Sequence, residues 1–224
     1  MNIPHHLGII PDGNRRFAKR EGISIAESYL AGSIIALAIT QQARALGVKH
    51  ISFFATSNEN VLRRPTEEIQ ALRVGVLHFC ESILSLGYGL HIVGNIEKIS
   101  RASDMETFQK LRARSNSRKD FVVHVDVNYS GEAESELAPL FQAISQYGLA
   151  EVRSNPRAFI SSAGVPDVDL VIRTGDKHRL SGFLPFQTTY AELYFLECLW
   201  GDFTQEMLEK AIMWFGQQDR TAGA

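Results

Sequence analysis

Short runs of β-branched and aromatic residues alternate with amphipathic stretches along the whole chain. The apolar runs predict six strands, at Leu7–Ile10, His50–Ala55, Leu90–Val93, Phe121–Val127, Val168–Ile172 and Leu193–Leu196. Between them, apolar residues recur at helical spacing, as in the stripe Ile69, Leu72, Val76, Cys80 and Ile83. Strands that alternate with helices predict an α/β fold, in which a parallel sheet is connected by crossover helices.

Turn and capping residues mark several helix ends. Gly47 is typical of a residue just past a helix, the Pro65–Glu68 segment of a helix start, and Thr204 of an N-cap. The sequence contains no internal repeat and no low-complexity linker. We therefore expect residues 1–224 to form a single domain.

Composition narrows the class of protein. Of 224 residues, 45% are hydrophobic, and 23 basic residues face 25 acidic ones, for a net charge of −2. This balance excludes a mainly disordered chain and gives no basic surface for nucleic acid. Cys80 and Cys198 lie in apolar stretches, which favours buried thiols in a reducing compartment over a disulfide. No stretch of 18 apolar residues and no charged leader appear, so we expect a cytoplasmic protein without a transmembrane segment.

The first polar cluster follows the first predicted strand and reads Pro11-Asp12-Gly13-Asn14-Arg15-Arg16. A helix that begins near Arg15 would offer free N–H groups and its positive dipole end, which together with two arginines suit a phosphate. Asp12 would repel a bare phosphate unless a divalent cation bridged the two. The alternative is that Asp12 is only a turn residue or an N-cap.

The second cluster follows the fifth predicted strand. Arg173 and Arg179 lie six residues apart, Gly175 permits a turn and Ser181 adds a hydroxyl. Two guanidinium groups and a hydroxyl suit a second diphosphate. The alternative is a solvated pair of arginines, or arginines that form ion pairs with Asp167, Asp169 or Asp176. Walker A, nucleophile-elbow, HExxH and zinc-finger patterns are all absent from the sequence.

Three long motifs together resemble the cis-prenyltransferases, the family that contains undecaprenyl diphosphate synthase. The segment 9–19 (IIPDGNRRFAK) resembles the family's opening IIMDGNGRWAK, and Ser57-Asn58-Glu59-Asn60 with Arg64-Pro65 resembles its SSENW-RP loop. The segments 168–184 and 190–195 resemble its C-terminal signature. The likeness spans nearly the whole chain.

The resemblance implies a six-stranded, mostly parallel sheet surrounded by helices, an apolar tunnel and a homodimer. It implies that Mg²⁺ is the cofactor, held by Asp12 and by Glu192, which would reach a neighbouring subunit's site. Catalytic roles fall on Asp12, Arg16 and Asn60, of which Asn60 would position the acceptor or the departing proton. The remaining residues that would bind the prenyl diphosphate substrates are Gly13, Asn14, Arg15, Tyr29, Ser57, Glu59, Arg173, Arg179 and Ser181. Glu59 has an alternative interpretation as a simple helix-facing acid.

Several positions depart from the pattern of the long-chain members. Tyr29 and Ile25 replace a histidine and an arginine of the first diphosphate site, and Val61 replaces a loop aromatic. Glu132 stands where an arginine is usual, and the C-terminal Arg-x-Gly motif is altered at residues 220–223. The segment 68–95 is about one helical turn shorter than its counterpart, and Phe53, Phe54 and Phe79 are candidates for closing the tunnel. The alternative is that these aromatic residues belong to the ordinary core.

A short tunnel and an altered acceptor site resemble the branch of the family that makes irregular monoterpenes. The expected reaction joins two dimethylallyl diphosphates head-to-middle and cyclises the product to a branched C10, cyclolavandulyl-type diphosphate. Two alternatives remain: a head-to-tail short-chain synthase that uses isopentenyl diphosphate, and a non-catalytic subunit that stabilises a partner.

Overall fold

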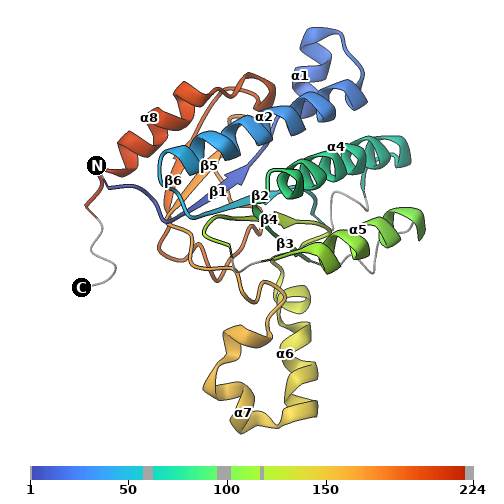
Figure 1. Cartoon of the computed structure of the whole chain (residues 1–224), viewed down its shortest axis with the longest axis vertical. Helices are drawn as coiled ribbons and strands as arrows, with labels where there is room; N and C mark the ends of the chain where they lie inside the picture. The colour runs from blue at the N-terminus through green and yellow to red at the C-terminus, as the bar shows by residue number, and fades with distance from the viewer. Residues whose placement is uncertain (1, 58–62, 95–101, 117–118, 220–224) are drawn as a thin grey trace.

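The structure, a computed structural model, describes residues 2–57, 63–94, 102–116 and 119–219. Its strands are β1 (His6–Ile10), β2 (His50–Phe54), β3 (Gly89–Val93), β4 (Val122–Asp126), β5 (Leu170–Arg173) and β6 (Glu192–Phe195). They form one sheet in the order β3-β4-β2-β1-β5-β6, and every pair is parallel (Figure 1). The predicted α/β fold with a six-stranded parallel sheet is confirmed.

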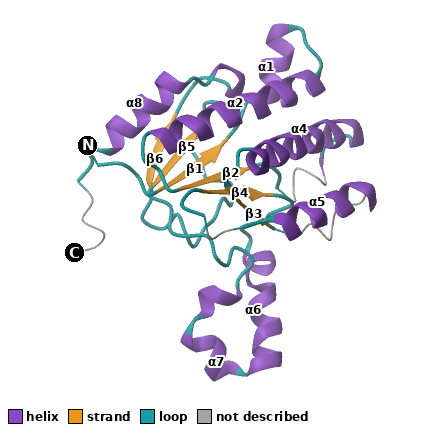
Figure 2. Cartoon of the chain, in the orientation of Figure 1, coloured by secondary structure: helices purple, strands orange, loops and turns teal. Residues whose placement is uncertain are grey.

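Helices connect the strands from β1 to β5 along the chain, and α8 follows β6 (Figure 2). They are α1 (Asn14–Glu21), α2 (Ile25–Ala45), α4 (Thr66–Ser85), α5 (Ala102–Arg114), α6 (Ala133–Tyr147), α7 (Leu149–Ser154) and α8 (Gln205–Phe215), with 3₁₀ turns η2 (Pro156–Phe159) and η3 (Trp200–Asp202). The Thr204 side chain accepts a hydrogen bond from the N–H of Met207, as predicted for an N-cap. Ser24 and Glu27 form a capping box at the start of α2.

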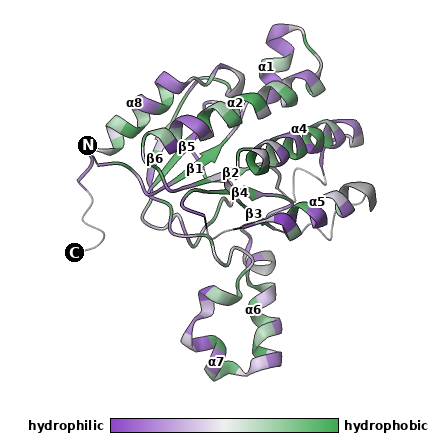
Figure 3. Ribbon diagram, viewed as in Figure 1, coloured by the Kyte–Doolittle hydropathy of each residue, from purple (hydrophilic) through white to green (hydrophobic). Residues whose placement is uncertain are grey.

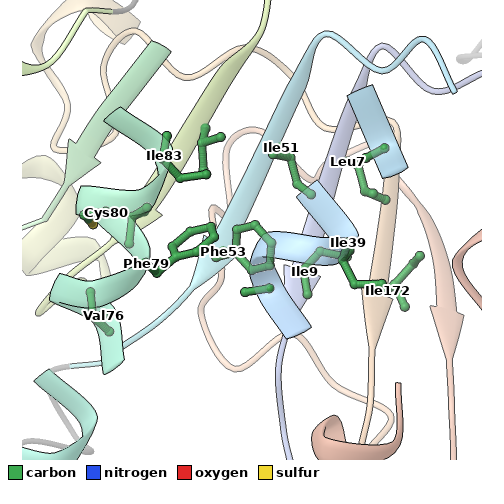
Figure 4. Close-up of a cluster of buried hydrophobic side chains, with 14 of the residues drawn as sticks. Leu7, Ile9, Ile39, Ile51, Phe53, Val76, Phe79, Cys80, Ile83 and Ile172 are labelled. Carbon is green, nitrogen blue, oxygen red and sulfur yellow. The ribbon is translucent and has the colours of Figure 1, made fainter. Parts of the chain in front are cut away.

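The larger hydrophobic core lies on one face of the sheet. Leu7, Ile9, Ile51 and Phe53 point from the strands toward α2, α4 and α8, which contribute Ile39, Phe79 and Leu208 among others. Figure 4 shows Phe53 and Phe79 facing each other between β2 and α4. The hydrophobic colours of Figure 3 gather accordingly in the strands, α2 and α4.

The opposite face of the sheet is covered by the chain between α7 and β6. Val165, Val168, Phe183 and Leu184 pack there against Ile10 and Val171. Helices α6 and α7 extend away from the sheet on this side of the chain (Figure 1). The close packing explains Gly8, where a Cβ would lie 2.7 Å from the Phe183 ring.

Four histidines also lie on this second face, and we call them the histidine row: His6, His50, His91 and His124. The Nδ1 of His50 lies 3.1 Å from Nε2 of His124, and the Nδ1 atoms of His91 and His124 are 3.1 Å apart. Burial lowers the pKa of all four imidazoles, that of His6 to about 3. The histidine row is therefore neutral at pH 7.

Within the described residues, no single helix has the length and apolar character needed to cross a membrane. Helices α1 and α2 reach that length and composition only as a pair, and the pair is bent by 118°.

Candidate active site

A cavity of about 1050 Å³ opens at the carboxyl ends of β1, β2 and β5. Ligands of open parallel sheets bind at this edge, because the loops that follow the strands converge there. One end of the cavity is lined by charged residues of the loops after β1 and β5. The other end is lined by apolar residues of β2, α2 and α4, among them Phe53, Ala36 and Val76.

Asp12 lies at the charged end, directly after β1. Its Oδ2 accepts a hydrogen bond of 2.8 Å from Nη2 of Arg173, and its Oδ1 is 3.6 Å from Nη2 of Arg16. The backbone of Asp12 is fixed as well, because its N–H donates to the Thr174 hydroxyl and its carbonyl accepts from the N–H of Trp200. The side chain keeps 32% of its surface exposed. The carboxylate is therefore held rigidly while it remains open to the cavity.

Helix α1 begins immediately after Asp12. Its N-cap is Gly13, with φ of 108°, and no side chain caps the helix. The first helical hydrogen bond runs from the N–H of Phe17 to the carbonyl of Gly13, so the N–H groups of residues 14–16 precede the helical ladder. The alternative interpretation of Asp12 as an N-cap is excluded, because its carboxylate contacts arginines instead. The helix start and Asp12 border the charged end of the cavity from two sides, and free N–H groups at a helix start are suited to bind an anion.

Arg173 connects the two polar clusters of the sequence. Its side chain is 5% exposed, and Nη1 donates to Ser181 Oγ at 3.0 Å and to the carbonyl of Arg179. Its other terminal nitrogen contacts Asp12, so the clusters that the sequence suggested as two sites share one wall. Arg173 is thus buried and paired, unlike the solvated arginine of the alternative interpretation, and Asp167 pairs with Arg157 instead.

Gly175 allows the two loops to meet. Its φ is +85°, and a Cβ there would lie 2.7 Å from Nη2 of Arg16 and 3.0 Å from the Asp12 carbonyl oxygen. The same Arg16 nitrogen donates to the Gly175 carbonyl at 2.6 Å. A side chain at this position would push Arg16 away from the charged end of the cavity.

The described lining carries a strong excess of positive charge. Its basic residues are Arg15, Arg16, Lys19, Arg63, Arg64, Arg173 and Arg179, whereas its acidic residues are Asp12 and Glu132. Seven cations against two carboxylates leave an excess of five in a protein whose net charge is −2. Such a concentration is typical of a site for multiply charged anions such as diphosphates.

Tyr29 lines the cavity from α2, opposite the start of α4. Its hydroxyl donates to Oε1 of Glu68 at 2.9 Å and accepts from Nη1 of Arg64 at 2.7 Å. Arg64 and Glu68 also form an ion pair of 3.3 Å, and Arg15 approaches the same carboxylate at 3.9 Å. Burial raises the pKa of the Tyr29 hydroxyl, so the group stays protonated at neutral pH.

Aromatic rings surround the apolar end. The Phe53 and Phe79 rings meet edge to face with centroids 5.0 Å apart, and Phe53 lies 6.4 Å from the Trp200 ring. Trp200 is fixed by a 3.0 Å hydrogen bond from Nε1 to the carbonyl of Gly32 on α2. All three, together with Phe54, line the cavity. The sequence-based candidates for closing a short tunnel thus stand in the wall of the cavity.

Most of the sequence-derived site residues converge on this cavity. Its lining includes Asp12, Gly13, Asn14, Arg15, Arg16, Tyr29, Ser57, Arg173, Arg179 and Ser181. Glu59 and Asn60 lie outside the described residues. Glu192 is not part of this lining: it begins β6, in register with Leu170 at the amino ends of the strands, whereas Asp12 follows the carboxyl end of β1.

Three residues of the site did not emerge from the sequence as site residues. Glu68 was assigned only to a helix start, and no separate role was assigned to Thr174 or Trp200. Glu68 is only 8% exposed, and its contacts with Tyr29 and Arg64 place it beside the cavity. The sequence contained a signal for Glu68. It lies four positions before Leu72, so its carboxylate is on the same face of the helix as the apolar stripe.

Comparisons with known proteins place the chain in a family. Residues 10–223 match the prenyltransferase family described as undecaprenyl diphosphate synthase. The isoprenyl transferase of Aquifex aeolicus (strain VF5) is 30% identical over 233 residues, covering 100% of this chain and 97% of that protein. The isoprenyl transferase of Streptococcus agalactiae serotype V is 32% identical over 238 residues, covering 99% and 93%.

A solved structure has the same fold. It is lavandulyl diphosphate synthase from Lavandula x intermedia in complex with dimethylallyl diphosphate, with a TM-score of 0.87, 22% identity and 99% of each chain covered. With the family match, the isoprenyl transferase relatives and the arginine-rich cavity, the chain is a prenyltransferase that belongs to the undecaprenyl diphosphate synthase family.

Proposed function

We propose that this prenyltransferase condenses two molecules of dimethylallyl diphosphate head-to-middle and cyclises the product to a branched C10 diphosphate of the cyclolavandulyl type. The observation that carries the proposal is the pairing of one continuous, arginine-lined polar end with an apolar end bounded by Phe53, Phe79 and Trp200. The polar end supplies cations for two diphosphates, and the apolar end supplies a hydrophobic wall for two C5 chains.

The size of the cavity supports a short product. Its 1050 Å³ corresponds to the upper end of pockets for small ligands, and that volume includes the polar end. The ligand of the lavandulyl diphosphate synthase with the same fold, dimethylallyl diphosphate, supports the choice of C5 substrate.

Magnesium fits the donor set of the charged end. Mg²⁺ binds phosphate substrates through one or two carboxylates together with phosphate oxygens and water, and Asp12 supplies a partly exposed carboxylate there. Among the described residues, no group of three or more His, Cys, Asp or Glu side chains could hold a metal by itself. A bound Mg²⁺ would stabilise the negative charge of the departing diphosphate.

The residues of the chain would divide the remaining work. Arg16 and the start of α1 hold the donor diphosphate, whose bond to carbon breaks to release pyrophosphate and leave an allylic cation. Arg173, Arg179 and Ser181 hold the acceptor diphosphate, while the acceptor double bond attacks that cation and loss of a proton gives the branched C10 diphosphate. Ring closure then adds a proton to one of its double bonds, the other double bond attacks the resulting cation, and loss of a proton completes the ring, so that these two proton transfers cancel. Fixed cations at the places where charge develops lower the barrier, because they need no reorganisation. Asn60 is a candidate for positioning the acceptor, and Glu59 for binding it.

We also propose that residues 1–224 act as one catalytic domain and that two copies form a cytoplasmic homodimer. Glu192 lies away from the cavity of its own chain, so a metal role for it requires a second subunit. A Glu192→Gln variant that stays dimeric and fully active would remove that role.

The deciding experiment supplies the purified chain with Mg²⁺ and dimethylallyl diphosphate as the sole substrate. We expect one pyrophosphate per branched or cyclic C10 diphosphate, identified by mass spectrometry and NMR. If only added isopentenyl diphosphate gives product, and that product is linear and cis, the head-to-tail alternative replaces the proposal. If no mixture releases pyrophosphate, the chain is the non-catalytic subunit of the second alternative.

A further inference from the structure

One hydroxyl group links α2 to the start of α4 at the rim of the cavity. The Tyr29 hydroxyl lies between the guanidinium of Arg64 at 2.7 Å and the carboxylate of Glu68 at 2.9 Å. Both partners also contact each other at 3.3 Å, so the three groups form a closed triangle. Each member is fixed by the other two.

The donor and acceptor capacity of Tyr29 limits what it can do. A phenol carries one hydrogen, and that of Tyr29 is directed to Glu68, while its oxygen accepts from Arg64. The group therefore has no hydrogen left to donate to a phosphate oxygen. Any effect of the hydroxyl on diphosphate binding must pass through Arg64.

Arg64 has unused hydrogen-bonding capacity. Its side chain is 19% exposed and lines the cavity, and its buried Nε has no hydrogen-bond partner among the described residues. A guanidinium has five N–H donors, and the triangle engages the Nη1 end. The donors of this partly exposed guanidinium that lie outside the triangle are those that a phosphate oxygen in the cavity would engage.

We propose that Tyr29 is a positioning residue, which together with Glu68 locks the Arg64 guanidinium in the orientation that receives a substrate diphosphate. The inference rests on the proposed function only in taking a diphosphate as the ligand. It also refines the sequence-based expectation for Tyr29, because the residue would act without touching the substrate. Tyr29 stands where long-chain relatives have a histidine, so this triangle would be a specific feature of this chain's diphosphate site.

The test measures inorganic pyrophosphate binding by calorimetry in magnesium-containing buffer, for wild type, Tyr29→Phe, Arg64→Ala and the double variant. Phenylalanine keeps the ring and its packing and removes only the hydroxyl. We expect each single variant to bind about tenfold more weakly, the effect of one hydrogen bond to a charged group. The double variant should bind no more than about twofold more weakly than Arg64→Ala, because Tyr29 has no route except Arg64.

Tyr88→Phe is the matched control, since Tyr88 packs against Phe121 and Arg44 and is absent from the cavity lining. It should bind pyrophosphate like the wild type. Two results would overturn the proposal: unchanged binding by Tyr29→Phe, or losses that multiply in the double variant. Product analysis with dimethylallyl diphosphate is a separate readout, so a wrong choice of substrate leaves the binding result interpretable.

Discussion

Basic side chains are charged in the cavity, whereas those of the histidine row are neutral. At the carboxyl ends of the strands, seven basic side chains face a hollow of about 1050 Å³, and Arg173 is held by Asp12, Ser181 and a carbonyl. On the second face of the same sheet, His6 and His124 are 0% and 1% exposed, and their imidazoles are forced into the neutral form. Basic side chains thus keep their charge where they line the cavity, and imidazoles are neutral where they are buried on the second face of the sheet.

From this difference we expect that the charged residues of the cavity serve the reaction and that the histidine row serves packing. Charged groups in the cavity carry an electrostatic cost that a bound diphosphate would offset, whereas the buried imidazoles are satisfied by each other and by Ser52. Substitutions at the first group should therefore change catalysis more than stability. Substitutions at the second should do the reverse.

The largest expected effect is that of Asp12→Ala. Loss of the carboxylate that would hold Mg²⁺ against the leaving diphosphate should lower kcat by about 10³-fold. The thermal midpoint should fall by no more than a few degrees, because the buried Arg173 loses Asp12 as a partner but keeps Ser181 and the carbonyl of Arg179. Steady-state kinetics and calorimetric melting check the two halves. Asp167→Ala, which removes a surface ion pair with Arg157, is the matched control and should retain activity. Wild-type kcat in Asp12→Ala would refute the assignment.

Arg173→Lys comes next. A lysine ammonium cannot contact Asp12 and Ser181 simultaneously as the planar guanidinium does. We expect kcat/KM for the diphosphate substrate to fall about 10²-fold, with most of the change in KM, measured by pyrophosphate release. Arg157→Lys keeps the charge at an exposed ion pair and should leave kcat/KM unchanged. Equal kinetics for both variants would mean that Arg173 needs only its charge.

A smaller effect concerns the pH dependence of stability. The pKa of His6 is about 3 in the folded protein. Between pH 6.5 and 3 the His6 imidazole is therefore protonated in the unfolded chain and neutral in the folded one. The free energy of unfolding should therefore fall on acidification, by about 1.4 kcal/mol per pH unit for His6 alone. Urea unfolding at pH 7.5 and 5.5 measures the slope. His6→Gln should reduce this slope of the free energy of unfolding with pH. An unchanged slope in that variant would contradict the assignment. His178→Gln, at an exposed position, is the control and should keep the wild-type slope.

The smallest effect is expected at Asp126, which is fully buried on the second face. Both carboxylate oxygens lack a hydrogen-bond partner among the described residues, and burial raises the pKa well above its usual range. The folded state thus binds a proton that the unfolded state releases, and stability declines as pH rises above about 4. Asp126→Asn removes this penalty and should stabilise the protein at pH 8 by about 1 kcal/mol. Destabilisation in urea unfolding would show that the carboxyl is needed. Asp120→Asn is an exposed comparison.

Local patterns were enough to predict most of the fold. The six predicted strands agree with the observed ones to within one or two residues, because each is a buried β-branched or aromatic run next to turn residues. Thr204 and Gly47 marked helix ends correctly, since their capping roles depend only on neighbouring residues. The strand order was not predictable in this way, because pairing such as that of β1 with β5 joins residues more than 160 positions apart.

The site was predicted in part. Asp12 and Arg173 follow strands and belong to long motifs, so the sequence selected both as candidates, and both line the cavity. Their direct contact could not be predicted, because it depends on Gly175 allowing two loops to touch. Glu68 was missed as a site residue, since an acidic residue in a helical first turn is usually explained by the helix dipole. Its role is visible only when Tyr29 and Arg64 are placed beside it.

The position of β1 in the sheet has a consequence for how the protein is made. Asp12 and Arg173 are separated by 161 positions, and β5 pairs with β1 from the opposite side to β2. A chain that emerges from the ribosome can pair β1 with β2 early, but residue 173 of 224 arrives late. Until then the Asp12 carboxylate has Arg16 but not Arg173 as a partner, and β1 is an open sheet edge. Chains that end before residue 173 lack Arg173, Arg179 and Ser181 of the cavity lining, so we expect them to bind pyrophosphate more weakly than the full chain.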